Sequence, residues 1–317
     1  MICNSTFPVS DNVAIRNSIF ISGGTNGPTV SRGFEVLGKY TYKIKSLKDD
    51  NFGHSMVINN SDELIVLGGL NFSPTDISKN CLVYRNNEWI HHSTMLRGRI
   101  YSSSIVMPEG TYVFGGKKCV PSGSHVSCEF LPNDKLHWSI LETEIPKPGL
   151  LMASCVAISP FKIVFTGGVG PTHRRIMTFD TKTMSWEIDG KLIHGRWGHA
   201  SFIFNGRIII TGGKNEKGER GYLNSTEILE LKSRKLKEGG RLNDPRHGHG
   251  IGVVNINNAQ KLVVFGGWSF NQVILTSVEA WDDDRECWER TDLHMPHGLS
   301  HFAYCSKSEL SELLCIE

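Results

Sequence analysis

The feature that most constrains this chain is a pair of adjacent glycines that occurs six times, each time after a short apolar run. The pairs begin at residues 23, 68, 115, 167, 212 and 266, at spacings of 45, 47, 52, 45 and 54 residues. A fixed period of about 20–50 residues is typical of repeat architectures, in which one unit cannot bury its apolar face alone. We therefore expect six copies of one supersecondary unit.

Each unit is expected to contain four short strands. A second apolar run begins 13 to 17 residues before the Gly pair, and a third follows the pair after a polar loop, as in residues 176–179. A Trp then comes about 20 residues after the pair in four of the units, at Trp89, Trp138, Trp186 and Trp288. Four-stranded units close radially, so each Trp would fill the wedge between adjacent sheets. Each Gly pair would end a second strand, where a Cβ would clash with the next sheet and the backbone needs a positive φ.

This order of apolar run, Gly pair, aromatic residue and Trp resembles the kelch repeat over residues 10–305. The resemblance implies an all-β, kelch-type β-propeller in which residues 1–317 form a single domain. Its predicted content is six full four-stranded repeats plus a C-terminal half repeat, in six or seven blades. A fold of this kind does not by itself define a function.

Two closures of the ring are compatible with the sequence. Residues 10–24 align without a gap with residues 199–213, so the first repeat is expected to have its own inner strand. Residues 301–305 then predict another inner strand, followed by an apolar segment at 313–316. Either six blades close with a C-terminal hairpin packed at the seam, or a reduced seventh blade is built from both termini.

Composition and targeting signals narrow the class of protein. The net charge of +2 provides no basic field for nucleic acid. No run approaches 18 apolar residues, and the N-terminus shows no leader pattern. We therefore expect a monomeric cytoplasmic protein without a membrane segment. Its eight cysteines would be free thiols, and the alternative is a hairpin disulfide between Cys119 and Cys128.

A search for catalytic and metal-binding motifs favours a protein that is not an enzyme. The sequence contains no Gly-x-Ser-x-Gly elbow, no phosphate-binding Gly-rich loop and no His-Glu-x-x-His motif. His54, His199, His249 and His301 each begin a predicted inner strand and could converge on a metal in the channel. We expect them instead to hydrogen-bond the neighbouring backbone, so no metal or other cofactor is predicted.

The candidate site is one face of the propeller. Loops that enter the inner strands and loops that leave the second strands open on the same side, and they carry Arg, His and aromatic residues. Such residues dominate interface hot spots, and Arg pairs with carboxylates, so the expected partner is a protein with an acidic peptide segment. The predicted partner-binding residues are Arg99, Tyr101, Arg174, Arg196, Trp197, Arg246, His247 and Trp268.

Two functions of different classes follow. The first is a non-catalytic interaction module, acting as a scaffold, adaptor or substrate receptor through this loop face. The second is a propeller subunit accessory to an enzyme. The loops with Pro after three Gly pairs, at Pro28, Pro74 and Pro171, resemble the propeller half of the tRNA wybutosine-synthesising methyltransferases. That resemblance implies a methyltransferase supplied by another chain.

Overall fold

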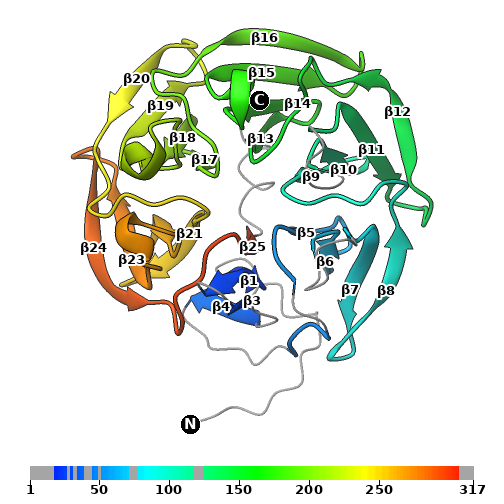
Figure 1. The fold of residues 1–317 in the computed structure, drawn as a ribbon, viewed down its shortest axis with the longest axis horizontal. Coiled ribbons are helices and arrows are strands. Elements are labelled where there is room, and N and C mark those ends of the chain that lie inside the picture. Colours follow the sequence, from blue (N-terminus) through cyan, green and yellow to red (C-terminus); the bar gives the residue numbers. More distant parts are fainter. Residues whose placement is uncertain are drawn as a thin grey trace.

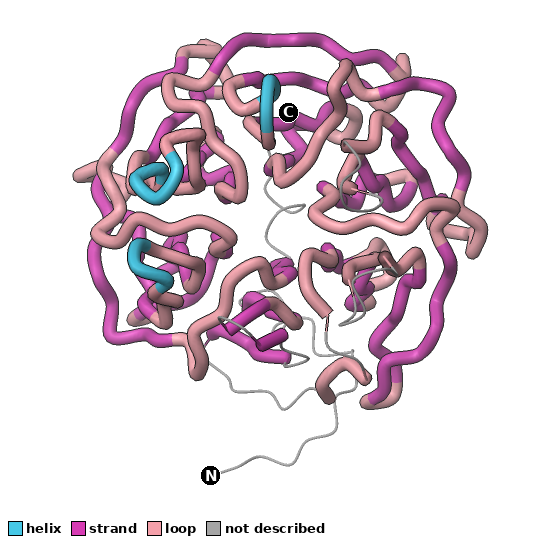
Figure 2. Tube along the Cα trace, viewed as in Figure 1, coloured by secondary structure: helices cyan, strands magenta, loops and turns pink. Residues whose placement is uncertain are grey.

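The computed structural model of the protein is a ring of β-sheets around a central channel (Figure 1). It describes residues 18–26, 29–30, 34–38, 45–48, 51–70, 77–117 and 124–306. Within each four-stranded sheet the strands pair antiparallel and follow one another in chain order. They succeed one another from the channel to the rim (Figure 2). Side chains from neighbouring sheets interlock between them, so the core is a circle of packed interfaces.

Five of the sheets are complete four-stranded blades. The first blade contains β5 (Ser55–Ile58), β6 (Leu64–Leu67), β7 (Asn80–Arg85) and β8 (Glu88–Thr94), and the second contains β9 (Ser103–Met107), β10 (Gly110–Phe114), β11 (Ser127–Pro132) and β12 (Ser139–Glu144). The third contains β13 (Ser154–Ser159), β14 (Lys162–Thr166), β15 (Arg175–Asp180) and β16 (Ser185–Lys191), and the fourth contains β17 (Ala200–Phe204), β18 (Arg207–Thr211), β19 (Thr226–Glu230) and β20 (Leu236–Gly239). The fifth contains β21 (Gly250–Ile256), β22 (Ala259–Phe265), β23 (Ser277–Asp282) and β24 (Cys287–His294).

Helical structure in the described residues is limited to three short 3₁₀ turns, η1 (Gly170–Thr172), η2 (Gly218–Gly221) and η3 (Phe270–Gln272). Each lies in a loop after a Gly pair. Nowhere in the described part of the chain does a helix have the length and apolar character needed to cross a membrane.

A three-stranded sheet closes the ring and corrects the predicted repeat count. Its strands are β25 (Ala303–Ser306), β1 (Ser18–Ser22) and β4 (Phe34–Gly38), in the order β25-β1-β4. A short hairpin, β2 (Thr25–Asn26) with β3 (Thr29–Val30), extends from β1. The prediction of six full four-stranded repeats plus a C-terminal half repeat, in six or seven blades, is wrong, because the described residues form five four-stranded blades.

The reason for this error is the pairing of the two chain ends. Phe20 of β1 lies opposite Cys305 of β25, so the C-terminal strand supplies the inner strand that β1 requires. Residues 301–305 therefore complete the first repeat and do not begin another. The separate inner strand predicted before β1 falls on residues 10–17, outside the described residues.

The Gly pairs end second strands, as predicted, and all twelve glycines have positive φ. Gly212 shows why the position excludes a side chain. A Cβ there would lie 2.5 Å from the carbonyl oxygen of Arg246 and 2.8 Å from Cε1 of His249, and both residues belong to the next blade. A larger residue at this position would collide with both atoms and so separate the two blades.

The four repeat tryptophans fill the wedges between sheets, as predicted. Trp89, Trp138 and Trp288 are buried, and two of them reach the preceding blade through Nε1. Trp138 donates to Ser93 Oγ at 3.0 Å, and Trp288 donates to Thr226 Oγ1 at 2.9 Å. Trp186 also packs against Phe114 of the preceding blade, and it is less completely buried than the other three.

The five described cysteines, Cys81, Cys128, Cys155, Cys287 and Cys305, are free thiols. Cys119, the other member of the possible hairpin disulfide, lies outside the described residues. The free thiol of Cys128 agrees with the expectation of reduced cysteines.

Replacing Trp288 with Ala should lower the free energy of unfolding by about 3–5 kcal/mol, the cost typical of deleting a buried large aromatic side chain. The substitution also leaves Thr226 without its donor. Urea denaturation followed by circular dichroism measures the change. A loss below about 1 kcal/mol, the range of ordinary surface changes, would show that Trp288 does not hold the fourth and fifth blades together.

Candidate functional site

The inner strands begin at a closed circle of six backbone hydrogen bonds, which we call the backbone ring. Each member donates its N–H to the carbonyl of the member before it, at 2.7–3.2 Å, and the first member, Gly53, donates to the last. All six have φ between 53° and 63°. In chain order the members are Gly53, Tyr101, Met152, Gly198, Gly248 and His301.

A second circle of hydrogen bonds surrounds the first. The second glycine of each Gly pair donates its N–H to a carbonyl in the next repeat, two residues before the ring member, at 2.8–3.0 Å. The accepting residues are Asn51, Arg99, Leu150, Arg196, Arg246 and Leu299. Because both circles join neighbouring repeats, the loops at this end of the channel form one rigid platform.

Three residues predicted to bind a partner have a structural role in this platform. Arg99, Arg196 and Arg246 are fully buried, and each forms an ion pair inside its own blade, with Glu129, Glu227 and Glu279 respectively, at 2.5–2.7 Å. We predicted that these arginines present their guanidinium groups to a partner. The structure corrects that prediction, because their guanidinium groups are enclosed and already paired.

The same four contacts recur in all three blades and define what we call the Arg clasp. In the fifth blade, Arg246 Nη1 donates to the carbonyls of Gly266 and Ser277 at 2.9 and 3.2 Å. Its Nη2 donates to Ser277 Oγ at 3.1 Å and to Glu279. The carboxylate of Glu279 also accepts backbone N–H groups from the loop that carries Arg246. The clasp thus ties the entering loop to the second and third strands of its blade.

The glutamates of the clasp were missed by sequence reasoning, although a signal exists. A Ser-x-Glu triplet follows each arginine by about 30 residues, at Ser127–Glu129, Ser225–Glu227 and Ser277–Glu279. In the third blade Leu150 stands at the position of the arginine, and Met177 stands at the position of the glutamate. The strand registers show the second equivalence, because Met177 pairs with Phe165 in the third blade and Glu129 pairs with Val113 in the second. Leu150 and Met177 belong to one apolar cluster, so the third blade has a buried apolar pair where the second, fourth and fifth blades have a buried ion pair.

Three of the inner-strand histidines form contacts between blades. His54, His199 and His249 are buried, and Nε2 of each hydrogen-bonds a hydroxyl at the end of the preceding second strand: Ser22, Thr166 and Thr211, at 2.9–3.3 Å. These partners are side chains and not the backbone groups that we predicted. Among the described residues, no three His, Cys, Asp or Glu side chains come close enough together to hold a metal ion.

His301 is not equivalent to these three histidines, because it lies one residue earlier in its repeat, on the backbone ring. Phe302 occupies the position of His54, His199 and His249. The side chain of His301 contacts three predicted site residues: its ring centroid lies 5.6 Å from Tyr101, 4.8 Å from His247 and 6.4 Å from Trp268. The structure therefore brings these three predicted residues together through a histidine that was considered for another role.

These rings continue into an aromatic arc around the ring end of the channel. Phe52 extends it at one end, at 6.3 Å from Tyr101. Tyr222 extends it at the other end, at 5.2 Å from His247 and 5.3 Å from Phe270. The members of the aromatic arc are Phe52, Tyr101, His301, His247, Trp268, Tyr222 and Phe270. Phe270 is exposed and most of the others are half-buried, so the arc is open to a partner.

The histidines of the arc are neutral at physiological pH. Burial, together with the neighbouring His301 and Lys214, lowers the pKa of His247 to about 3. Burial also lowers the pKa of His301 to about 4. Nδ1 of His247 and Nε1 of Trp268 are buried with no hydrogen-bond partner. The arc is thus an uncharged surface with unsatisfied polar atoms, which an incoming group could satisfy.

The other two predicted residues lie near the arc but do not join it. Trp197 is half-buried, and its backbone pairs with Lys214 in a short ladder that extends the fourth blade. Arg174 is exposed, and its Nε donates to the carbonyl of Leu192 at 2.9 Å. Nζ of Lys214 lies 4.7 Å above the ring of Tyr222. Cations therefore flank the aromatic surface.

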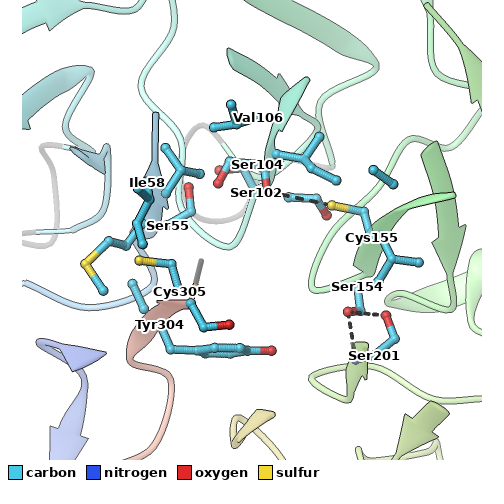
Figure 3. Close-up of a pocket in the computed structure, with 18 of the residues that line it drawn as sticks. Ser55, Ile58, Ser102, Ser104, Val106, Ser154, Cys155, Ser201, Tyr304 and Cys305 are labelled. Atoms are coloured by element: carbon cyan, nitrogen blue, oxygen red, sulfur yellow. Dashed lines mark hydrogen bonds between the residues drawn. The ribbon is translucent and has the colours of Figure 1, made fainter. Parts of the chain in front are cut away.

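A cavity of about 690 Å³ occupies the channel beneath the backbone ring (Figure 3). Its lining starts one residue after the ring members, as at His54 and Phe302. Serine side chains are frequent in the wall, and Ser201 Oγ donates to Ser154 Oγ at 2.7 Å across two inner strands. The cavity and the aromatic arc thus lie on opposite sides of the backbone ring.

Comparison with known proteins agrees with this architecture. The Kelch motif matches residues 245–291, the segment that holds most of the fifth blade and its Arg clasp. This match, together with the ring of four-stranded blades, supports a kelch-repeat β-propeller. The solved structure of YjhT, at 15% identity, superposes with a TM-score of 0.69 over 91% of this chain and 100% of that one, which shows the shared fold.

Two curated relatives are similar over much of the chain. Alpha-scruin of Limulus polyphemus is 25% identical over 70% of this chain, and the match covers 24% of its own length. Kelch domain-containing protein 3 of Homo sapiens is 26% identical over 77% of this chain, and the match covers 66% of that protein. Kelch propellers are typically protein-interaction modules, and kelch-domain homologues are generally not enzymes. The likeness to the wybutosine methyltransferases, the monomeric state and the cytoplasmic location stay predictions.

Replacing Arg246 with Leu should lower the free energy of unfolding by about 3–5 kcal/mol, because Glu279 is left buried without its cation. The double substitution Arg246→Leu with Glu279→Met copies the apolar pair of the third blade and should recover part of that loss. Urea midpoints of the two variants provide the comparison. A double variant less stable than the single one would contradict the equivalence of the two pairs.

Stability should fall as the pH drops below about 6.5. His54 and His199 have folded pKa values of about 4 and about 3 because of burial, whereas a histidine in the unfolded chain takes up its proton near 6.5. Between these values the unfolded state binds more protons, so each such histidine lowers the free energy of unfolding by about 1.4 kcal/mol per pH unit of acidification. His199→Gln should therefore show a shallower loss of Tm between pH 7 and pH 4.5 than the parent chain. Identical profiles would rule out this role for His199.

Proposed function

We propose that the chain is a non-catalytic protein-interaction module that binds its partner on the loop face around the backbone ring. It would act as a scaffold, an adaptor or a substrate receptor. The aromatic arc is the observation that carries this proposal. It joins loops from the closing sheet and from the first, second, fourth and fifth blades into one surface.

The composition of the arc suits a protein interface. Tyr and Trp bury a large area at low cost in side-chain entropy, and hot spots are enriched in them. The two circles of backbone hydrogen bonds hold the loops in place before the partner arrives. A preorganised surface loses less conformational entropy on binding, so more of the contact energy remains as affinity.

The charges beside the arc favour an acidic partner. Lys117, Arg174 and Lys214 lie in or beside the loops of this face, and the ion pairs formed within the described residues involve none of the three. Carboxylates of a partner could pair with them at little desolvation cost, because these cations are partly exposed. We therefore propose a partner segment rich in Asp and Glu.

The test is a pull-down with the full chain beside a face variant, Trp197→Ala with Lys214→Ala. Truncating hot-spot residues costs about 2 kcal/mol or more, so the face variant should lose the specific partner while its Tm stays near that of the parent. The matched control is Ile188→Ala, because Ile188 is 57% exposed on the outer strand β16, away from the loop face. Equal capture by the parent and the face variant would refute the proposed surface, and loss in the Ile188 control would refute its specificity.

A further inference from the structure

Three members of the backbone ring are not glycine, although all six members have the positive φ that glycine adopts most easily. Gly53, Gly198 and Gly248 have positive φ, a conformation that glycine adopts without steric cost. Tyr101, Met152 and His301 occupy the equivalent positions at φ of 56°, 55° and 53°, where a Cβ is disfavoured. Backbone strain of this kind concentrates at functional sites, and here glycine is the available alternative in the same ring.

Two of the three side chains meet on the ring, and the third covers the next ring member. Gly53 stands between Tyr101 and His301, and the two aromatic rings meet beside it, with centroids 5.6 Å apart. Met152 reaches the next member, since its Cε would lie 3.5 Å from a Cβ placed on Gly198. All three are only half-buried. Each side chain thus covers a glycine of the ring and keeps part of its surface in solvent.

Two polar atoms nearby have no hydrogen-bond partner among the described residues. Nε1 of Trp268 is a donor without an acceptor, and Nδ1 of His247 is likewise unpaired, in a side chain that is 8% exposed. Both rings contact His301. Buried polar atoms are normally hydrogen-bonded, so a ligand that brings a carbonyl or carboxylate oxygen would supply the acceptor that Trp268 lacks.

We propose that Tyr101, Met152 and His301 are specificity-determining contact residues, which together receive one apolar side chain of an acidic partner segment while Trp268 donates to that segment's backbone. This proposal rests on the proposed function and identifies its central subsite. A phenol ring, a thioether and a neutral imidazole offer an apolar surface, and the flanking Lys214 and Lys117 accommodate the acidic neighbours of the anchor.

The alternative is that the three side chains only fill space above the ring. The two explanations differ in how affinity and stability change together. Replacement by glycine removes the strained Cβ, so a contact residue lost this way should weaken binding while the Tm is unchanged or higher. A space-filling residue lost this way should lower the Tm and leave the affinity of the folded protein unaltered.

The experiment selects peptides from a random-sequence display library on the full chain and measures the best one, labelled with fluorescein, by fluorescence anisotropy. We expect selected peptides in which Asp or Glu flanks an apolar residue. Tyr101→Gly, Met152→Gly and His301→Gly should each raise the Kd by about 10-fold or more, at unchanged or higher Tm. The matched control is Met184→Gly, which removes the same residue type from the same conformation (φ 52°), in the hairpin turn between β15 and β16. It should leave the Kd unchanged.

The outcomes separate this inference from the proposed function. If Trp197→Ala with Lys214→Ala weakens peptide binding but the three ring variants do not, the interaction face stands and this subsite is wrong. A ring variant that lowers the Tm and keeps the Kd identifies a space-filling residue and also overturns the inference. If no peptide binds the full chain, the inference and the proposed function both fail.

Discussion

The structure depends on one closed circle of hydrogen bonds, in which every repeat donates to one neighbour and accepts from the other. An open sheet has edges with unpaired groups, whereas a ring has none at this position. The donor of Gly53 reaches the acceptor of His301, so the first and last parts of the described chain are joined at the same place where β1 pairs with β25. Removing any member would open the ring, which makes this circle the point at which separate repeats become one molecule.

The Gly pairs and the Arg clasps hold neighbouring repeats in the positions that this circle of hydrogen bonds requires. Each Gly pair brings its second strand close enough to the next repeat for a backbone hydrogen bond, and a side chain there would collide with the carbonyl of the accepting residue. In three blades that accepting residue is the arginine of a clasp, so one residue is held by its guanidinium to its own blade and by its carbonyl to the preceding blade. Stability and the shape of the loop face therefore have a common origin, and the face is rigid before any partner binds.

This rigidity explains why the proposed site lies on the ring. Where the ring needs only backbone, glycine occupies the left-handed position. Tyr101, Met152 and His301 occupy it with side chains that contact or border the aromatic arc. Three of the six ring members thus belong both to the platform and to the proposed contact surface, and the channel cavity beneath the ring is a separate space.

The sequence by itself determined the repeat, its four-strand content, the place and reason of the Gly pairs, and the wedge position of the repeat tryptophans. Each of these depends on local spacing, which a single repeat displays. It did not determine the number of complete blades, because the pairing of Phe20 with Cys305 joins residues from opposite ends of the chain. It also could not tell which polar residues face inward. Arg246 and Trp268 both belong to loops of the same face. The guanidinium of Arg246 is buried because it pairs with Glu279 inside the blade, whereas the ring of Trp268 lies beside His301. Only the tertiary structure decides whether such a residue is buried in its blade or lies on the loop face, because a charge is buried only where folding brings an oppositely charged partner close to it.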